Sequence, residues 1–230
     1  MISKITESTA AAVADIRDES TVMIGGFGSA GQPVELIDAL LDQGATDLTV
    51  VNNNAGNGTT GLAALLQAGR VRKIICSFPR QVDSQVFDGL YRAGKLELEL
   101  VPQGTLAERI RAGGAGIAGF FTPAGFGTIL AAGKETRNIN GRDYVLENAL
   151  TADYALIKAH RGDRLGNLVY RKTARNFGPL MVSAASTAIA QVAQIVEVGE
   201  LDPEAVVTPG IYIQRVVAVG GGTALSTEGQ

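Results

Sequence analysis

Residues 21–33 read Thr-Val-Met-Ile-Gly-Gly-Phe-Gly-Ser-Ala-Gly-Gln-Pro, and this stretch decides the fold. Thr21 to Ile24 have the residue types of a buried strand, and glycine follows at positions 25, 26, 28 and 31. Pro33 suits the first turn of a helix, where its missing N–H costs little. Glycines let the backbone approach a ligand, and a helix start presents free N–H groups and a positive dipole end. We therefore predict an anion or nucleotide site at this turn.

Two other interpretations of the turn stay open. The segment Gly26 to Gly31 also fits the dinucleotide fingerprint G-x-G-x-x-G, which expects an acidic residue after the next strand to hold a ribose hydroxyl. The next predicted strand, Asp47 to Val51, is followed by Asn52-Asn53-Asn54, so that carboxylate is missing and a nicotinamide site is disfavoured. The turn can also have a purely structural role, in which it packs the strand against the helix.

The composition narrows the class of protein. The 20 basic and 23 acidic residues give no reason to expect a nucleic acid or an anionic membrane as a partner. No segment approaches the roughly 18 apolar residues of a membrane span, and the N-terminus lacks the apolar core of a signal peptide. The single cysteine, Cys76, forms no internal disulfide, which fits a reducing compartment. We expect a cytoplasmic protein. With one histidine, His160, and one cysteine, we expect no metal. The motif G-x-x-x-x-G-K-[ST] is missing, so we expect no ATP and no other cofactor.

Strand and helix patterns alternate through the first half of the chain. Four βα units in a row predict an α/β fold with a doubly wound, mostly parallel sheet flanked by helices. In such sheets ligands bind beyond the carboxyl ends of the strands. Four loops are therefore expected to converge there: Gly25 to Gly31, Asn52 to Gly58, Ser77 to Arg80, and Gln103-Gly104.

The second half of the chain is less regular. We interpret Gly113 to Gly127, rich in glycine and aromatic residues, as a packed irregular loop. We predict one domain over residues 1–219 and a disordered tail over 220–230, where glycine and small polar residues dominate. Further strands are predicted at Tyr144 to Leu146, Tyr154 to Ala159, Asn167 to Tyr170, Ile189 to Val196 and Ile211 to Val219.

Gln103 is the first candidate for chemistry. It follows a predicted strand and precedes Thr105-Leu-Ala-Glu108, which has the form of a capping box that opens a helix. A side-chain amide placed there can donate to an oxygen that becomes negative during acyl transfer. The alternative is a loop glutamine that bonds only to nearby backbone.

Several motifs, spread over nearly the whole chain up to about Val219, resemble the α subunit of class I CoA-transferases. The long motif that begins at Val101 is the most specific, and one departure is Glu19, at a place usually held by glycine or asparagine. The motifs are Asp18 to Pro33, Asn53 to Gly56, Val101 to Gly116, Arg171 to Phe177, Leu201 to Glu204 and Thr208 to Arg215.

The resemblance implies a mechanism and a partner. A glutamate attacks an acyl-CoA, and CoA passes to an acceptor acid through a mixed anhydride and a glutamyl-CoA thioester. In two-subunit members that glutamate belongs to a β subunit, so an αβ or (αβ)₂ assembly is expected. Glu147 corresponds to a non-catalytic strand position and is rejected as the nucleophile. This chain is thus expected to be half of an enzyme.

The resemblance also implies roles for residues of this chain. Gln103 would be the oxyanion donor, and Gly25, Gly26, Phe27 and Gly28 would lie near the thioester and acyl group, with Asn53 as a further substrate or CoA contact. The loops at 54–61 and 77–83 are similar to those of members that use succinyl-CoA and 3-oxoadipate.

Two groups of basic residues have open roles. Because both exchanged acids would be dicarboxylates, Arg80 is a candidate clamp for the distal carboxylate, and a packing or interface role is the alternative. Arg171, Lys172 and Arg175 form a basic cluster that would meet CoA phosphates, or else solvent or an interface.

Other functions also stay open. In one alternative, the chain is the same type of subunit but acts on acetoacetate or a short-chain fatty acid. In another, the chain belongs to a different class of protein and is a non-catalytic or regulatory domain that binds a sugar phosphate.

Overall fold

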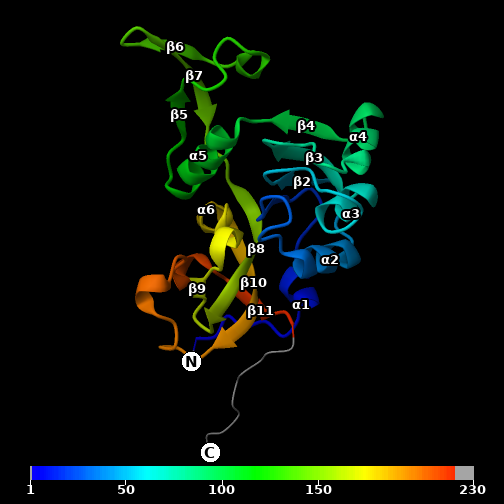
Figure 1. Cartoon of the computed structure of the whole chain (residues 1–230), viewed down its shortest axis with the longest axis vertical. Coiled ribbons are helices and arrows are strands. Elements are labelled where there is room, and N and C mark those ends of the chain that lie inside the picture. The colour runs from blue at the N-terminus through cyan, green and yellow to red at the C-terminus, as the bar shows by residue number, and fades with distance from the viewer. Residues whose placement is uncertain (1, 221–230) are drawn as a thin grey trace, which may run out of the picture.

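Seven parallel strands form the main sheet in residues 2–220, the part of the chain that the computed structural model describes (Figure 1). They are β1 (Thr21–Ile24), β2 (Leu48–Val51), β3 (Val71–Cys76), β4 (Glu97–Leu100), β8 (Ala152–Asp163), β10 (Ala185–Val196) and β11 (Arg215–Ala218). Their order is β11-β10-β8-β1-β2-β3-β4, and the short β9 (Leu168–Val169) pairs antiparallel with β8. The predicted doubly wound, mostly parallel sheet is confirmed.

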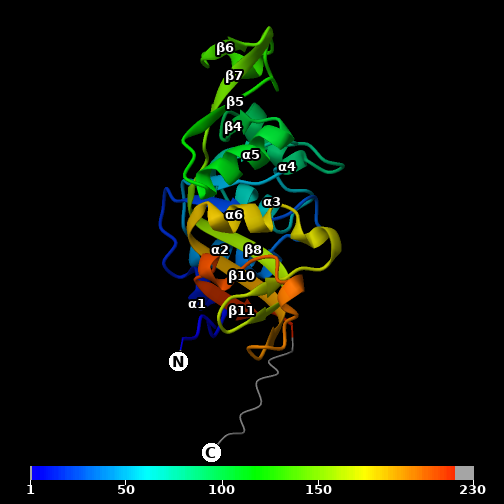
Figure 2. The ribbon, with the colours of Figure 1, turned by 90° about the vertical axis from the view of Figure 1, so that its left-hand side faces the viewer.

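Helices cover both faces of this sheet. On one face lie α1 (Thr9–Val13), α2 (Val34–Gln43), α3 (Leu62–Gln67) and α4 (Gln85–Arg92), and on the other lie α5 (Gln103–Gly114) and α6 (Gly178–Ser183). Figure 2 looks onto α5 and α6. Short 3₁₀ helices are η1 (Ile129–Ala131), η2 (Lys172–Arg175), η3 (Pro203–Ala205) and η4 (Gly210–Tyr212).

Two apolar clusters hold these layers together. Val22 and Ile24 of β1 enter the cluster under α1 to α4, whereas Met23 enters the cluster under α5 and α6. All three side chains are fully buried. Successive side chains of a strand point to opposite faces, so a continuous apolar run is what a strand covered on both faces requires.

A second sheet stands apart from the main body, at the top of Figures 1 and 2. It is antiparallel, with the order β5-β7-β6, and consists of β5 (Gly119–Thr122), β6 (Thr136–Ile139) and β7 (Arg142–Asn148). The prediction of an irregular loop over 113–127 was therefore wrong at β5. That strand pairs with β7, more than twenty residues further along the chain, and no local pattern indicates this pairing.

Two element boundaries also differ from the predictions. Helix α5 begins at Gln103, with Pro102 as its N-cap, so the predicted capping box at Thr105 is wrong. The Thr105 hydroxyl is buried and has no hydrogen-bond partner within residues 2–220. The last predicted strand, from Ile211, is η4 at its start and becomes β11 only at Arg215.

The single-domain boundary over residues 1–219 stays a prediction. The predicted tail lies, apart from Gly220, outside the described residues. Among residues 2–220, no helix has both the length and the apolar character that crossing a membrane requires.

Candidate functional site

A pocket of about 390 Å³ opens at the carboxyl ends of the parallel strands. Its walls come from all four loops that were expected to converge, because strands that run in parallel end at the same edge of the sheet. The lining residues are Phe27, Gly28, Asn53, Asn54, Ser77, Phe78, Gln81 and Gln103. Four of the predicted site residues, Phe27, Gly28, Asn53 and Gln103, are thus brought together.

A chain of hydrogen bonds joins three of these loops inside the pocket. The Gln103 side-chain Nε2 donates to Asn53 Oδ1 at 2.8 Å, and the Ser77 hydroxyl donates to the same oxygen at 2.8 Å. An amide nitrogen carries two hydrogens, so Gln103 keeps one donor for another acceptor. The alternative of a loop glutamine that bonds only to nearby backbone is not what the structure shows.

The start of α5 adds a second source of positive potential. Gln103 is its first residue, and no side chain among residues 2–220 caps this N-terminus. The first N–H groups of a helix have no partner within the helix and carry the positive end of its dipole. Gln103 therefore presents its amide beside an electropositive helix end.

The asparagine loop is buried and ordered by its own side chains. Asn52 Nδ2 donates to the Ile24 carbonyl at 2.6 Å, and the Asn54 backbone N–H donates to Asn52 Oδ1 at 2.8 Å. Asn54 Nδ2 is buried without a hydrogen-bond partner in the described part of the chain. Because an unpaired buried donor costs free energy, such a group in a pocket wall favours an acceptor that arrives with a ligand.

The glycine turn is clamped by one distant side chain. Asn176 Oδ1 accepts from the Gly26 N–H at 3.1 Å, and its Nδ2 donates to the Ala30 carbonyl at 2.9 Å. At Gly31, with φ +72°, a Cβ would lie 2.3 Å from the Ala174 carbonyl oxygen, so only glycine fits this approach. The two segments are thus locked face to face.

The N-terminus of α2 does not serve as the predicted anion site. Gln191 of β10 fills it, since its Oε1 accepts from the Leu36 N–H at 3.1 Å and its Nε2 donates to Glu35. A side chain more than 150 residues away thus occupies the position that the sequence left for a ligand. Of the glycine turn, Phe27 and Gly28 line the pocket, while Gly25 and Gly26 are not among its lining residues.

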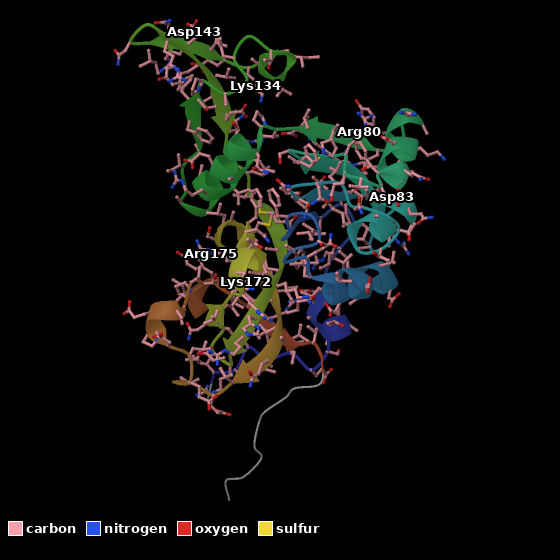
Figure 3. The ribbon with its side chains drawn as sticks, in the orientation of Figure 1. Arg80, Asp83, Lys134, Asp143, Lys172 and Arg175 are labelled. Atoms are coloured by element: carbon pink, nitrogen blue, oxygen red, sulfur yellow. The ribbon has the colours of Figure 1, made fainter. Side chains whose placement is uncertain are left out.

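Arg80 points elsewhere in this structure. Its Nε forms an ion pair with Asp88 of α4 at 2.7 Å, and it is not among the residues that line the pocket (Figure 3). Gln81, the next residue, lines the pocket instead. The role of Arg80 as a carboxylate clamp therefore stays a prediction.

The described pocket lining has no carboxylate that could act as the nucleophile of a mixed-anhydride mechanism. None of its described residues carries a carboxylate, an amine or an imidazole. Cys76 ends β3 next to the pocket, but burial raises the pKa of its thiol to about 12, so it stays protonated. Glu147 is buried in the small sheet and paired with Lys134 at 2.7 Å, which supports rejecting it as the nucleophile.

Sequence reasoning missed four lining residues: Asn54, Ser77, Phe78 and Gln81. All four belong to loops that were expected at the site, so the signal was present at the level of loops. The sequence did not indicate which side chains of these loops face the pocket, because side-chain directions in a loop follow no fixed period.

Residues 6–219 match the family described as "Coenzyme A transferase", and the chain belongs to that family. The nicotinamide and sugar-phosphate interpretations have no support from this match. The chain is 69% identical to the A subunit of 3-oxoadipate CoA-transferase from Pseudomonas putida, over 98% of each chain.

Two further comparisons define the wider relationship. The A subunit of a probable succinyl-CoA:3-ketoacid coenzyme A transferase from Bacillus subtilis is 50% identical, over 93% of this chain and 89% of that one. The crystal structure of glutaconate coenzyme A-transferase from Acidaminococcus fermentans has the same fold, with a TM-score of 0.84 at 21% identity, over 95% of this chain and 76% of that chain.

Proposed function

We propose that this chain is the α subunit of a CoA-transferase that moves CoA from succinyl-CoA to 3-oxoadipate. The observation that carries the proposal is the pocket lining, which offers amide donors and no carboxylate. Transfer through a glutamyl-CoA intermediate needs both a carboxylate nucleophile and oxyanion donors. This chain supplies the donors, and a β subunit in an αβ or (αβ)₂ assembly supplies the glutamate. The P. putida relative is named as one subunit of its enzyme, which supports this division.

The exchange balances without an oxidant, ATP or a net proton. The glutamate carboxylate attacks the succinyl-CoA carbonyl carbon, the C–S bond breaks, and a succinyl-glutamyl anhydride forms. The CoA thiolate then attacks the glutamyl carbonyl, which releases succinate and leaves glutamyl-CoA. The carboxylate of 3-oxoadipate attacks this thioester, and the released thiolate attacks the 3-oxoadipyl carbonyl of the new anhydride. The product is 3-oxoadipyl-CoA, and the glutamate side chain of the enzyme is regenerated as a carboxylate.

Each attack places negative charge on a carbonyl oxygen. The second hydrogen of Gln103 Nε2 is the donor for that oxygen, since the first is held by Asn53. Stabilisation is strongest when the donor is already oriented, and the bond from Gln103 to Asn53 provides this orientation. Phe27 and Phe78 supply apolar surface to the lining, and a hydrogen bond is stronger where such surface displaces water.

No metal or further cofactor takes part in this proposal, because one thioester is exchanged for another and the CoA thioester is itself a substrate. The proposal also places the enzyme in the cytoplasm. The lone thiol of Cys76, buried and without an internal disulfide partner, fits a reducing compartment.

The test is CoA transfer from succinyl-CoA to 3-oxoadipate by this chain alone and with its β subunit. We expect activity only from the assembly, and a loss of kcat of about 10²–10³ in Gln103→Ala, the range found for loss of an oxyanion donor. Gln85→Ala, at the exposed start of α4, is the matched control and retains activity. Full activity of this chain alone would reject the division of roles.

The name of the B. subtilis relative specifies a 3-ketoacid, a class that includes acetoacetate as well as 3-oxoadipate, so acetoacetate is the second candidate acceptor. Acetoacetate lacks the distal carboxylate of 3-oxoadipate, so the ratio of kcat/KM for the two acids distinguishes the alternatives. A preference for acetoacetate would keep the family and overturn the acceptor.

A further inference from the structure

A second cavity, of about 700 Å³, adjoins the first, and Phe27 lines both. Its other walls are Ala30 from the glycine turn and Lys172, Thr173, Arg175 and Asn176 from η2 and the residue after it. In Figure 2 the yellow turn that contains η2 projects from the right-hand side of the molecule. A ligand bound in the neutral first pocket would therefore lie next to a second, larger cavity.

Two cations of this cavity have no counter-charge. Lys172 and Arg175 are exposed, and neither forms a salt bridge or a side-chain hydrogen bond within residues 2–220 (Figure 3). Arg80 and Lys134, labelled in the same figure, do have carboxylate partners. The lining of the cavity contains no carboxylate, so its two cations lie beside apolar and neutral polar groups alone.

The backbone that carries these cations is held in an unusual conformation. Lys172 has φ +51° and Asn176 has φ +23°, so two of the five non-glycine residues with positive φ in the described chain lie in this segment. Asn176 Nδ2 also donates to the Thr173 carbonyl at 3.2 Å, in addition to its bonds with the glycine turn. Such conformations persist only where the surroundings enforce them, and they gather at ligand sites. The backbone that carries the two cations is therefore fixed relative to the glycine turn.

We infer that this cavity is an anion-binding subsite next to the acyl-transfer site, in which Lys172 and Arg175 bind a phosphate or carboxylate group of a substrate. The inference rests on the proposed function, because the substrates named there carry such groups. A phosphate of CoA and the distal carboxylate of the dicarboxylic acid share the chemistry that lysine and arginine recognise. The neutral first pocket offers no cation for either group.

The experiment uses the assembled αβ enzyme. Lys172→Ala, Arg175→Ala and the double variant are compared with Lys95→Ala and Arg17→Ala, an exposed lysine and an exposed arginine that line neither cavity. We expect KM for the bound substrate to rise at least tenfold in the double variant, with a smaller change in kcat. Lys172→Arg retains most of the affinity, since it keeps the charge. The Lys95 and Arg17 variants match wild type.

Two substrate arms identify the charged group. If the subsite holds a CoA phosphate, KM for succinyl-CoA rises, while KM for succinyl-pantetheine, which lacks phosphates, stays the same. If it holds the distal carboxylate, KM rises for 3-oxoadipate and not for acetoacetate. Unchanged constants for all four substrates would overturn the subsite.

Two controls separate a substrate subsite from an interface role and from failure of the proposed function. Loss of αβ assembly in the double variant, measured by size-exclusion chromatography, would mean that the cations belong to the subunit interface and would overturn the inference. Calorimetry with free CoA measures binding without turnover. Wild-type enzyme that binds CoA but does not transfer it to 3-oxoadipate would count against the proposed function, and the variants would still test the subsite.

Discussion

The main sheet and the small sheet are stabilised by different forces. The main sheet is covered on both faces by helices, and its two apolar clusters consist of fully or nearly fully buried side chains. In the small sheet, β6 is exposed along its whole length, and within β7 only Val145 and Glu147 are buried. A unit with so little buried apolar surface cannot be stabilised by the hydrophobic effect alone.

A chain of charges connects the small sheet to the main body. Arg109 of α5 donates to Glu99 of β4 at 2.7 Å and to the carbonyl of Asn148 at 2.8 Å. Its Nε lies 4.0 Å from Glu147, which pairs with Lys134. Arg109 thus links the main body to a sheet that has almost no core of its own.

The largest expected effect is that of Arg109→Ala. Its side chain is only 11% exposed, and its loss leaves Glu147 buried with one remaining partner. We expect the free energy of unfolding to fall by about 3–5 kcal/mol, as when one partner of a buried pair is removed. Urea unfolding measures this change. Arg111→Ala, which removes an exposed pair on the same helix, should change little. Equal effects of the two variants would contradict the comparison.

Truncation of an apolar side chain should cost more free energy of unfolding in the main sheet than in the small sheet. Leu40 of α2 is fully buried in the main cluster, whereas Ile139 of β6 is 37% exposed. We expect Leu40→Ala to cost about 3 kcal/mol through lost burial and a cavity. Ile139→Ala should cost less than about 1 kcal/mol, as surface substitutions do. Thermal or urea unfolding checks both values, and a comparable loss from Ile139→Ala would reveal a core in the small sheet that the structure does not show.

A smaller effect is expected from pH, through Glu99. Burial raises the pKa of this carboxyl, but hydrogen bonds from Lys73 and Arg109 outweigh burial, and the pKa lies below its ordinary value of 4.5. A depressed pKa contributes stability above the unfolded value, and this contribution is lost as pH falls through 4.5 toward the folded value. Wild type should therefore lose more stability between pH 6 and pH 4 than Glu99→Gln. Parallel pH profiles of the two proteins would contradict this.

The smallest effect concerns one turn in each region. Asn140 (φ +52°) and Gly141 form the hairpin turn between β6 and β7, with residue types that favour such angles. Glu19, before β1, has φ +66° and lacks this preference. We expect Glu19→Asn to stabilise the protein by up to about 1 kcal/mol and Asn140→Glu to destabilise it by a similar amount. Unfolding midpoints that move in the same direction in both variants would show that φ is not the cause.

Much of the fold was predictable because its signals are local. Thr21 to Ile24 was predicted as a strand and is β1, and Gly44, with φ +99°, ends α2 as expected of a glycine after a helix. The site was predictable to the level of loops, because parallel strands bring their carboxyl ends to one edge. Gln103 was predicted as a site residue because it comes directly after a predicted strand, which is β4, and before a helix.

Other features depend on residues that are far apart in the sequence. Gln191 fills the start of α2, and Asn176 clamps the glycine turn. Each is a choice among partners that only the folded chain brings near, so no spacing in the sequence encodes it. The pairing of β5 with β7 has the same origin.

The sequence by itself determined the parallel sheet, the set of loops at its edge, and the resemblance that led to the family. These depend on the local periodicity of apolar residues, on glycine and proline, and on contiguous motifs. Only the tertiary structure decided which side chains face the pocket, where Arg80 points, and that Lys172 and Arg175 lie beside Phe27. Contacts between distant segments are selected by packing and charge in three dimensions, and a one-dimensional pattern carries no record of them.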